Sequence, residues 1–296
     1  MLKMACIWIR MKRITKYSMR LKMSILRGIF KKNRMYQNVV LITGCATGIG
    51  KHLAERFYKR NYNVVATDGD IEALKNAFSD WDTEGCLIEK LDVTKAEDWQ
   101  RIISRTVAEF GQLDICINNE GVIAPNFVLD MDFQDIDYQI DVNTKGVLYG
   151  SKFAAELMIR QGSGHIINFS SLPGFAPSHG LSVYAASKQA VRAFTLSIVP
   201  ELKAKGVFIS VICPDLVDMD MKPNARTSFF PLFKKRHLTA TDIEIAVFQR
   251  ALNDHEVEIL VPKNRTFLAK VGNLFPSIGF KLSGFFETKE KDDRKR

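Results

Sequence analysis

A tyrosine and a lysine four positions apart, Tyr184 and Lys188, are the first residues of this chain that could carry out chemistry. In a helix this spacing places both side chains on one face, one turn from each other. A nearby ammonium favours the ionised form of a phenol and so lowers its pKa. Such a tyrosine can exchange a proton with a carbinol oxygen near neutral pH. The same pair also occurs on ordinary exposed helices, so its meaning depends on its surroundings.

A glycine-rich stretch near the start of the chain predicts a phosphate-binding turn. The apolar run 38–42 is followed by Thr-Gly-Cys-Ala-Thr-Gly-Ile-Gly at 43–50 and then by a helical pattern. Strand, glycine-rich turn and helix in this order bind a dinucleotide pyrophosphate, because the backbone approaches the phosphates closely and the first N–H groups of the helix meet their charge. The alternative is an ordinary strand–helix connection. The residues concerned are Gly44, Gly48, Ile49 and Gly50.

The next apolar run, 63–67, ends at Asp68. An acidic residue about 20 positions after the glycines can accept hydrogen bonds from an adenosine ribose. Its charge would repel a 2′-phosphate, and no arginine stands beside it in the sequence. Asp68 therefore predicts NAD rather than NADP, and the alternative is a helix N-cap or a turn residue.

Strand and helix patterns alternate six times, which predicts a doubly wound parallel α/β sheet. The expected strands are 38–42, 63–67, 86–91, 113–117, 165–169 and 207–212, with a further strand at 257–261. Thr94 and Glu97 have the spacing of a capping box after the third strand. Ligands of such sheets lie at the carboxyl ends of the strands. The polar or special residues expected there are Gly44, Asp68, Asp92, Asn118, Ser171 and Pro214.

A long helical region is expected over 133–160, with Asn143, Thr144 and Gly146 in its middle. These residue types lower helix propensity. A local conflict of this kind often marks a functional position.

The composition is that of an ordinary globular protein, with 46% hydrophobic and 25% charged residues in 296. The net charge of +9 is unevenly distributed, because residues 1–36 hold eleven Lys/Arg and no acidic residue, and residues 263–296 hold nine basic and four acidic residues. Residues 37–262 therefore carry a net −7. A nucleic-acid-binding domain needs a basic face on the fold itself, so we expect no nucleic-acid partner.

The five cysteines are widely spaced, and no CxxC or Cys/His cluster is present. We therefore expect neither a disulfide framework nor a metal site, and a reducing, cytoplasmic location. No apolar run approaches the roughly 18 residues of a membrane-spanning helix.

Three segments are expected: a basic leader at 1–36, a catalytic domain at 37–262, and an apolar and basic extension at 263–296. The leader reads as an amphipathic helix on an anionic membrane, a targeting segment, a disordered leader, or sequence upstream of a start at Met35. Peripheral membrane contact through both termini is one expectation.

These motifs together resemble the short-chain dehydrogenase/reductase family over roughly 37–262. The glycine turn matches at 43–50, the family's Asn-Asn-Ala-Gly appears as Asn-Asn-Glu-Gly at 118–121, and the Tyr-x-x-x-Lys pair is present. In the family the catalytic serine lies thirteen residues before the tyrosine, which selects Ser171 rather than Ser170. The four catalytic residues that match are Asn143, Ser171, Tyr184 and Lys188.

The resemblance implies a role for each of these residues. Tyr184 would be the general acid/base, and Ser171 would hydrogen-bond the substrate oxygen. Lys188 would lower the pKa of Tyr184 and bind the nicotinamide ribose, and Asn143 would hold a water that relays protons. The cofactor residues implied are Gly44, Gly48, Ile49, Gly50, Asp68, Asp92, Val93, Asn118, Tyr184, Lys188, Pro214 and Val217. A homodimer or homotetramer, formed through the helices after strands four and five, is also implied.

Three residues depart from the family pattern. Glu120 stands where the family has alanine, Asp215 where it has glycine, and Met219 where it has threonine. Glu120 is expected to change the packing or the pH response near the cofactor cleft, and Asp215 and Met219 to change how the nicotinamide is positioned.

The expected lid, 219–240, is rich in aromatic residues, which suits an apolar substrate. We therefore expect hydride transfer between NAD and a lipophilic secondary alcohol or ketone of sterol, retinoid or acyl type. One alternative is a reductase of a small polar carbonyl or sugar. The other is a non-catalytic NAD-sensing scaffold.

Overall fold

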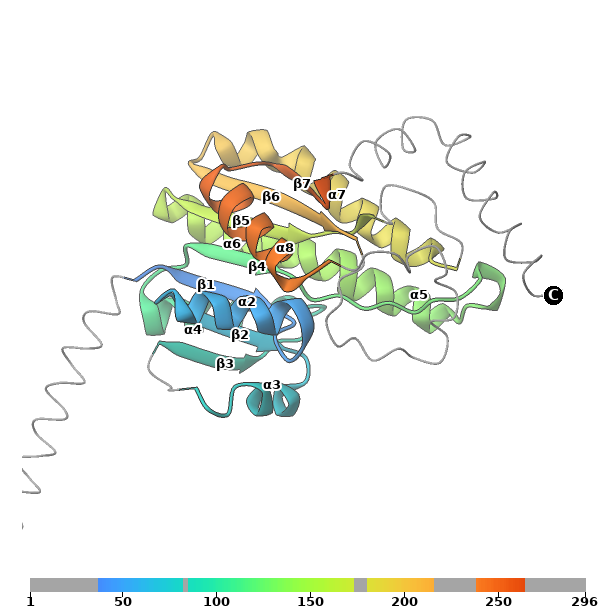
Figure 1. The fold of residues 1–296 in the computed structure, drawn as a ribbon, viewed down its shortest axis with the longest axis horizontal. Helices are drawn as coiled ribbons and strands as arrows, with labels where there is room; N and C mark the ends of the chain where they lie inside the picture. The colour runs from blue at the N-terminus through green and yellow to red at the C-terminus, as the bar shows by residue number, and fades with distance from the viewer. Residues whose placement is uncertain (1–36, 82–84, 173–179, 216–237, 264–296) are drawn as a thin grey trace, which may run out of the picture. The chain divides into compact units, whose positions relative to one another are not determined.

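The computed structural model describes residues 37–81, 85–172, 180–215 and 238–263. Over these residues the chain forms a parallel sheet of seven strands in the order β3-β2-β1-β4-β5-β6-β7 (Figure 1). The expected doubly wound fold is confirmed. The strands are β1 Val39–Thr43, β2 Asn63–Asp68, β3 Cys86–Lys90, β4 Ile115–Asn118, β5 Gly164–Phe169, β6 Val207–Pro214 and β7 Glu258–Val261.

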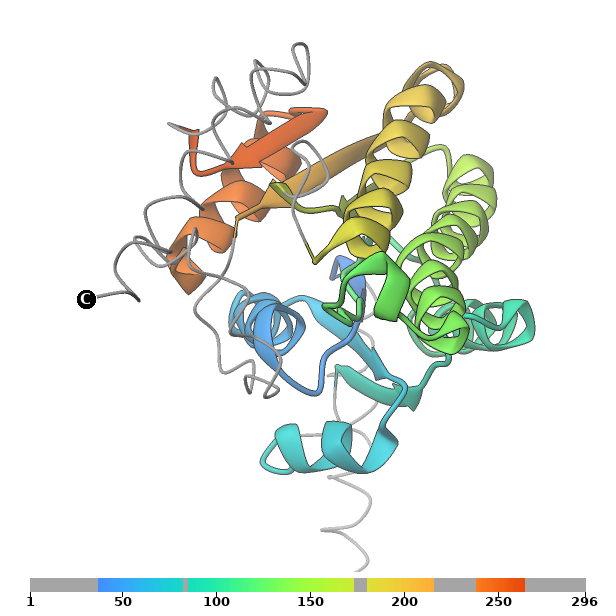
Figure 2. The ribbon, with the colours of Figure 1, turned by 90° about the vertical axis from the view of Figure 1, so that its right-hand side faces the viewer.

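Helices cover both faces of the sheet (Figure 2). The central strands are mostly apolar and are buried except at one end residue of β2 and of β5, as expected of parallel strands covered on both sides. One face packs against α2 (Gly48–Lys59), α3 (Ile71–Ala77), α8 (Ala240–Glu244) and η6 (Ile245–Asn253). The other packs against α4 (Ala96–Phe110), α6 (Val147–Gln161) and α7 (Ser182–Lys203).

The expected helical region at 133–160 is confirmed, with a change of helix type in its middle. The helix α5 (Phe133–Ile140) passes into a π-helical turn, η2 (Asp141–Gly146), before α6 begins. Asn143 and Gly146, whose residue types have low α-helix propensity, both lie in this π turn. π turns inside α-helices are frequent at functional sites.

The expected capping box after the third strand is wrong. Helix α4 begins at Ala96 with Lys95 at its N-cap, which makes no side-chain capping bond. The Thr94 hydroxyl instead donates to Asp92 Oδ1 at 2.6 Å. Because the Thr94 hydroxyl bonds to the nearby Asp92 carboxylate, it does not cap the backbone N–H groups at the start of α4.

Several expectations lie outside the described residues. They are the basic leader 1–36, the aromatic part of the lid, Val217, Met219 and the terminal extension from residue 264 onward. Peripheral membrane contact through the termini stays a prediction. Among the described helices, none is long and apolar enough to cross a membrane.

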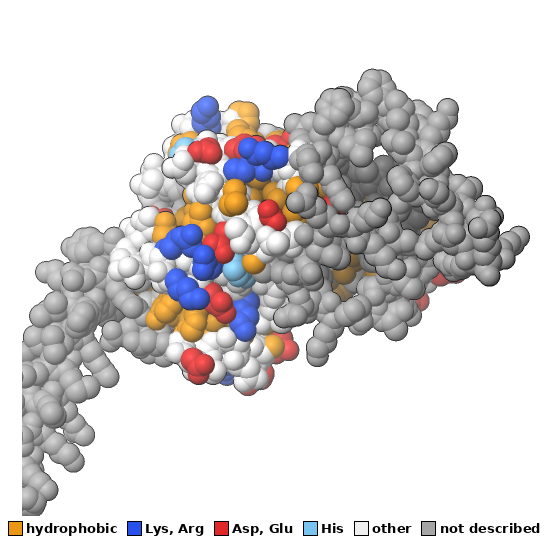
Figure 3. Space-filling model, viewed as in Figure 1, with side chains coloured by type: hydrophobic (Ala, Val, Ile, Leu, Met, Phe, Trp, Pro, Cys, Tyr) orange, Lys and Arg blue, Asp and Glu red, His pale blue; other side chains and the backbone are white. Residues whose placement is uncertain are grey.

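Charged side chains of both signs are interspersed on the described surface over α2 and α8 (Figure 3). Part of this mixture is a cluster around Glu244 of α8, which contacts His52 at 2.8 Å and Arg56 at 2.8 Å on α2. The cluster joins two helices that pack on the same face of the sheet, although His52 and Glu244 are 192 residues apart in the sequence.

Helix α6 approaches β4 closely at Gly150. A Cβ on Gly150 would lie 2.1 Å from Asn118 Oδ1 and 2.5 Å from the ring of Trp99. Both neighbours are fully buried, so neither can move aside cheaply.

We therefore expect Gly150→Ala to destabilise the protein by about 2 kcal/mol, although alanine is intrinsically better than glycine in a helix by about 1 kcal/mol. The midpoint of urea unfolding measures the change. Lys152→Ala, at an exposed position two residues away, is the control and should change stability by less than about 0.5 kcal/mol. A Gly150→Ala variant as stable as the wild type would contradict the tight packing.

Candidate active site

A cavity of about 880 Å³ lies at the carboxyl edge of the sheet. Its walls come from the segments that follow β1, β2, β3, β4, β5 and β6, and from the start of α7. Strands β1 and β4 are neighbours, although β2 and β3 separate them in sequence, so the order of strands reverses between them. This is the place where doubly wound sheets bind their ligands.

The glycine turn forms one wall of the cavity. Gly44 and Gly48 have φ of 70° and 58°, a conformation that other residues rarely adopt. The N-cap Thr47 makes no side-chain capping bond, and the first turn of α2 holds no acidic residue. The first N–H groups of this helix can therefore receive an anionic group from the cavity.

Gly50 has a different role from Gly44, Gly48 and Ile49, which line the cavity. A Cβ on Gly50 would lie 2.0 Å from the carbonyl oxygen of Gly44. Gly50 thus permits close packing of the helix on the turn behind the cavity wall.

Asp68, at the end of β2, lines the cavity beside this turn. Its Oδ2 accepts from the N–H of Ala46 at 2.9 Å, and its Oδ1 accepts from the N–H of Asp70 at 3.0 Å. These two bonds orient the carboxylate at the cavity edge. Lys90 of β3 is paired with Asp68 of β2 and also lines the cavity. A basic group therefore lies near Asp68, although none stands beside Asp68 in the sequence.

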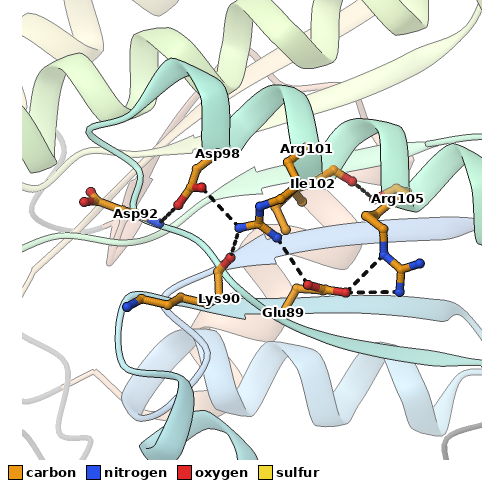
Figure 4. A network of polar contacts seen from close by, with 8 residues as sticks. Glu89, Lys90, Asp92, Asp98, Arg101, Ile102 and Arg105 are labelled. Carbon is orange, nitrogen blue, oxygen red and sulfur yellow. Dashed lines mark hydrogen bonds and ion pairs between the residues drawn. The ribbon is translucent and has the colours of Figure 1, made fainter.

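Asp92 and Val93 follow β3 and also line the cavity. An ion-pair network fixes this segment to α4 (Figure 4). Arg101 binds Glu89, Asp98 and the carbonyl oxygen of Lys90, while Asp98 accepts from the N–H of Asp92 at 3.0 Å. Burial acts to raise the pKa of Asp92, but hydrogen bonds from Thr94 and Lys95 outweigh it and hold that pKa below its ordinary value.

The two asparagines at the end of β4 have different positions relative to the cavity. Asn118 does not line the cavity, because its side chain is buried behind it and donates to Asn168 at 2.8 Å and to Ser151 at 3.2 Å. Asn119 lines the cavity and donates to the carbonyl oxygen of Thr43 at 2.8 Å. We expected Asn118 to line the cofactor cleft. Because side chains alternate at the end of a strand, the side chain of Asn118 points into the core and that of Asn119 lines the cavity.

Tyr184, Ser171 and Lys188 meet in the same cavity. Ser171 comes two residues after the end of β5, and Tyr184 and Lys188 lie in the first turns of α7. The hydroxyl of Ser171 lies close enough to Tyr184 to favour its ionised form and lower its pKa. Ser171 Oγ also donates to the carbonyl oxygen of Pro214 at 3.3 Å, so the ends of β5 and β6 are tied together.

Burial is the main influence on the pKa values of Tyr184 and Lys188. It raises the pKa of Tyr184, and the hydrogen bond with Ser171 offsets part of the rise. Burial also lowers the pKa of Lys188 to about 8. The expected lowering of the Tyr184 pKa by Lys188 is therefore not seen in the protein alone, where the ammonium nitrogen lies 5.9 Å from the ring centroid and donates to the carbonyl oxygen of Phe169.

Asn143 lies beneath the cavity wall and does not line it. Its Oδ1 accepts from the N–H of Val122 at 2.7 Å, and its Nδ2 donates to the Val122 carbonyl and to Ser187 Oγ. A Cβ on Gly121 would lie 3.0 Å from Lys188 Nζ and 3.2 Å from Asn143 Oδ1. Gly121 therefore lets Asn143 and Lys188 converge, and the relay through a water stays a prediction.

Glu120 lies close to two aspartates from other strands, a proximity that the sequence pattern did not predict. It lines the cavity between Asp68 and Asp92, and its Oε2 is buried without a hydrogen-bond partner. Burial first, and then the charges of Asp68 and Asp92, raise the pKa of Glu120 to about 8. Asp215, the other described departure from the family pattern, is buried and also lines the cavity.

The cavity suits a dinucleotide. The uncapped start of α2, the carboxylate of Asp68 and the unpartnered Glu120 oxygen are hydrogen-bonding groups that a phosphate and a ribose would satisfy. Among the residues that the structure describes, no group of three or more His, Cys, Asp or Glu is arranged to hold a metal ion.

Residues 38–228 match the short chain dehydrogenase family. The chain is 31% identical over 221 residues to an uncharacterized oxidoreductase of Staphylococcus aureus, covering 75% of this chain and 94% of the relative. It is 34% identical over 184 residues to a diacetyl reductase, (S)-acetoin forming, of Staphylococcus epidermidis, covering 61% of this chain and 72% of the relative.

A solved short-chain dehydrogenase/reductase from Burkholderia phymatum, in complex with NAD, has the same fold. The TM-score is 0.74 at 23% sequence identity, with 82% of this chain and 95% of that chain covered. The chain therefore belongs to the short-chain dehydrogenase/reductase family and is an NAD(P)-dependent oxidoreductase.

Proposed function

We propose that the protein is an NAD-dependent dehydrogenase/reductase of lipophilic secondary alcohols or ketones, with Tyr184 as its general acid/base. The observation that carries this proposal is that Tyr184, Ser171 and Lys188 line one cavity together with the glycine turn. A proton-transfer group and a phosphate-binding turn in one cavity are what hydride transfer requires.

A bound nicotinamide supplies or accepts the hydride, and the chain supplies proton transfer and position. In the oxidation direction, the phenolate form of Tyr184 takes the proton of the substrate hydroxyl and becomes the neutral phenol, while Ser171 holds the substrate oxygen by a hydrogen bond. In reduction, Tyr184 returns that proton to the oxygen. Lys188 is charged below a pH of about 8, and its ammonium stabilises the phenolate as it forms.

Asn143 contributes by holding the backbone around Val122 in place. Its amide spans the N–H and the carbonyl of Val122 and reaches Ser187, one residue before Lys188. This arrangement fixes the helix that carries Lys188 relative to the cavity wall.

Two carboxylates favour NAD over NADP. Asp68 and Asp92 line the cavity beside the glycine turn, opposed by the ammonium of Lys90. A 2′-phosphate would add negative charge among them. The Burkholderia phymatum relative was solved with NAD, which supports the same preference.

Apolar side chains support a lipophilic substrate. Those that line the cavity in the described residues include Val122, Ile123, Val142, Phe169 and Leu181. A cavity lined in this way favours a ligand with an apolar body and few polar groups.

A second candidate substrate is a small ketone. The Staphylococcus epidermidis relative is named a diacetyl reductase and is 34% identical over 184 residues. A pocket that accepts apolar surface also accepts a short ketone, since the reacting carbonyl would meet the same Tyr184 and Ser171.

We also propose that the chain forms a homodimer or homotetramer through α5 and α7. The side chains of Phe133 and Tyr138 on α5 are 86% and 56% exposed. Aromatic residues are enriched in the cores of protein interfaces, where burying them contributes most of the binding energy.

The proposed function predicts turnover of a lipophilic secondary alcohol or its ketone with NAD(H). Sterol, retinoid and acyl alcohols are compared with diacetyl by the absorbance of NADH, with NAD and NADP in parallel. Higher kcat/KM for diacetyl would select the small-ketone candidate, and higher kcat/KM with NADP would refute the preference drawn from Asp68. Binding of NADH without turnover of any compound would favour a non-catalytic NAD-sensing protein.

Replacing Tyr184 with phenylalanine removes the proton-transfer group and little else. We expect Tyr184→Phe to lower kcat by about 10³-fold, because general acid/base catalysis contributes on the order of 10² to 10⁴. The affinity for NADH, followed by fluorescence, should change by less than about threefold. Tyr149→Phe, outside the cavity, is the matched control with wild-type turnover. Wild-type turnover by the Tyr184→Phe variant would refute the mechanism.

Replacing Phe133 with aspartate tests the oligomer. A charge at the centre of an apolar interface should shift the protein toward the monomer, as measured by light scattering after size-exclusion chromatography. Gln100→Asp, at an exposed position of α4 outside the proposed interface, is the control for added charge and should leave the oligomer unchanged. An unchanged oligomer in the Phe133→Asp variant would exclude this part of α5 from the interface.

A further inference from the structure

Glu120 occupies a defined part of the cavity. A Cβ on Gly44 would lie 3.0 Å from Glu120 Cα, and a Cβ on Gly69 would lie 3.6 Å from Glu120 Oε1. The carboxyl group therefore lies between the glycine turn and the residue that follows Asp68. This is the half of the cavity in which Asp68 and Asp92 would meet an adenosine.

The charged groups around Glu120 come from several elements. Asp68 after β2 and Asp92 after β3 disfavour its ionisation, and Cys45 after β1, whose own pKa is raised by burial, interacts with it as a thiol. Asp70, Lys90, Lys188 and Asp215 line the same cavity. The influences on the Glu120 carboxyl are burial and the two aspartates, all of which disfavour its ionisation.

Glu120 Oε2 has no hydrogen-bond partner, although it is buried. An unpartnered buried carboxyl oxygen costs free energy in the ligand-free protein, and a ligand that supplies a partner regains it. A ribose hydroxyl can both donate and accept a hydrogen bond. A neutral carboxyl group offers one donor and acceptor capacity in return.

We propose that Glu120 binds the adenosine ribose of the cofactor as a neutral acid, beside Asp68, so that cofactor affinity depends on the proton held by Glu120. This inference rests on the proposed binding of NAD(H) in the cavity. It assigns a ligand-binding role to a residue that stands where the family has alanine.

The sign of the dependence follows from the charges. Ionised Glu120 would place a third carboxylate with Asp68 and Asp92, close to the turn that receives the anionic pyrophosphate. It would also lose its donor to the ribose. Both effects weaken binding, so affinity is constant below a pH of about 8 and falls above it.

ADP is the probe that isolates this half of the cavity. It carries the adenosine and both phosphates but lacks the nicotinamide ribose, so it does not report the protonation of Lys188. Its phosphates no longer titrate above about pH 7.5, since the second pKa of a phosphate is about 6. Isothermal titration calorimetry of the full chain gives the ADP dissociation constant at each pH.

The dissociation constant of the wild type should rise roughly eightfold between about pH 7.5 and pH 9, as the protonated fraction falls. Glu120→Gln, which keeps a donor and an acceptor but cannot ionise, should bind as tightly as the wild type near neutral pH and show no such rise. Glu120→Ala should be equally independent of pH and weaker by about fivefold, for the lost hydrogen bond. Glu156→Gln, an exposed carboxylate outside the cavity, should match the wild type throughout.

A pH-independent wild type, or a Glu120→Gln variant that weakens as steeply as the wild type, would overturn the inference. Failure of all variants to bind both ADP and NADH at every pH would instead refute the proposed function, so the two failures are distinguishable.

The ligand-free protein provides a second readout. Because the pKa of Glu120 is raised from its ordinary value of 4.5 to about 8, the fold holds a proton that the unfolded chain releases. Wild-type stability should therefore fall as pH rises from about 4.5 to about 8, whereas the Glu120→Gln variant lacks this contribution. The urea midpoint of Glu120→Gln should exceed that of the wild type by a margin that grows across this range. A constant margin would show that Glu120 is already ionised and overturn the inference.

Discussion

Burial of polar groups at the carboxyl edge of the sheet is the constraint on which the site depends. Parallel strands covered by helices on both faces desolvate the polar residues at their ends, although some polar side chains, such as Ser210, are buried within a strand. The same desolvation raises the pKa of Tyr184 and of Glu120 and lowers that of Lys188. In the ligand-free protein Tyr184 is thereby kept neutral, and the pKa of Lys188 is brought to about 8. The fold thus determines the protonation states as well as the positions.

The site keeps its geometry because a buried polar network lies directly behind it. Asn118 of β4 and Asn168 of β5 share a hydrogen bond, Ser151 of α6 joins both, and Asn168 donates to Thr195 of α7 at 2.9 Å. The network thus connects two central strands with the two helices on one face. Fully satisfied buried networks of this kind are rigid, because each lost partner leaves an unpaired polar group in the core. Asn118 therefore supports the cavity from behind, where its burial prevents direct contact with a ligand.

Sequence patterns were sufficient for the order of elements and for most residues of the cavity. Apolar runs with glycine or aspartate at their ends located β1, β2 and β3 to within about two residues, the precision expected of such patterns. The spacing of Tyr184 and Lys188 predicted a shared helix face. Three-dimensional packing decided what the patterns could not. Whether Asn118 or Asn119 faces the cavity depends on the alternation of side chains at a strand end, and the partner of Thr94 depends on which carboxylate lies nearer. The raised pKa of Glu120 depends on two aspartates from other strands, which no local pattern reveals.

Two groups that line the cavity, Lys188 and Glu120, have pKa values near the same pH, and this affects how the pH dependence of turnover is interpreted. Burial brings the pKa of Lys188 and that of Glu120 each to about 8, from ordinary values far apart and from opposite directions. Loss of a proton from Lys188 removes the charge that stabilises the phenolate of Tyr184, whereas loss of a proton from Glu120 adds a charge beside the adenosine. Both changes lower turnover as pH rises, so one falling limb of a pH–rate profile would contain both. Separating kcat from KM distinguishes them in principle, because the first acts on proton transfer and the second on cofactor binding. A single apparent pKa near 8 therefore identifies neither residue by itself.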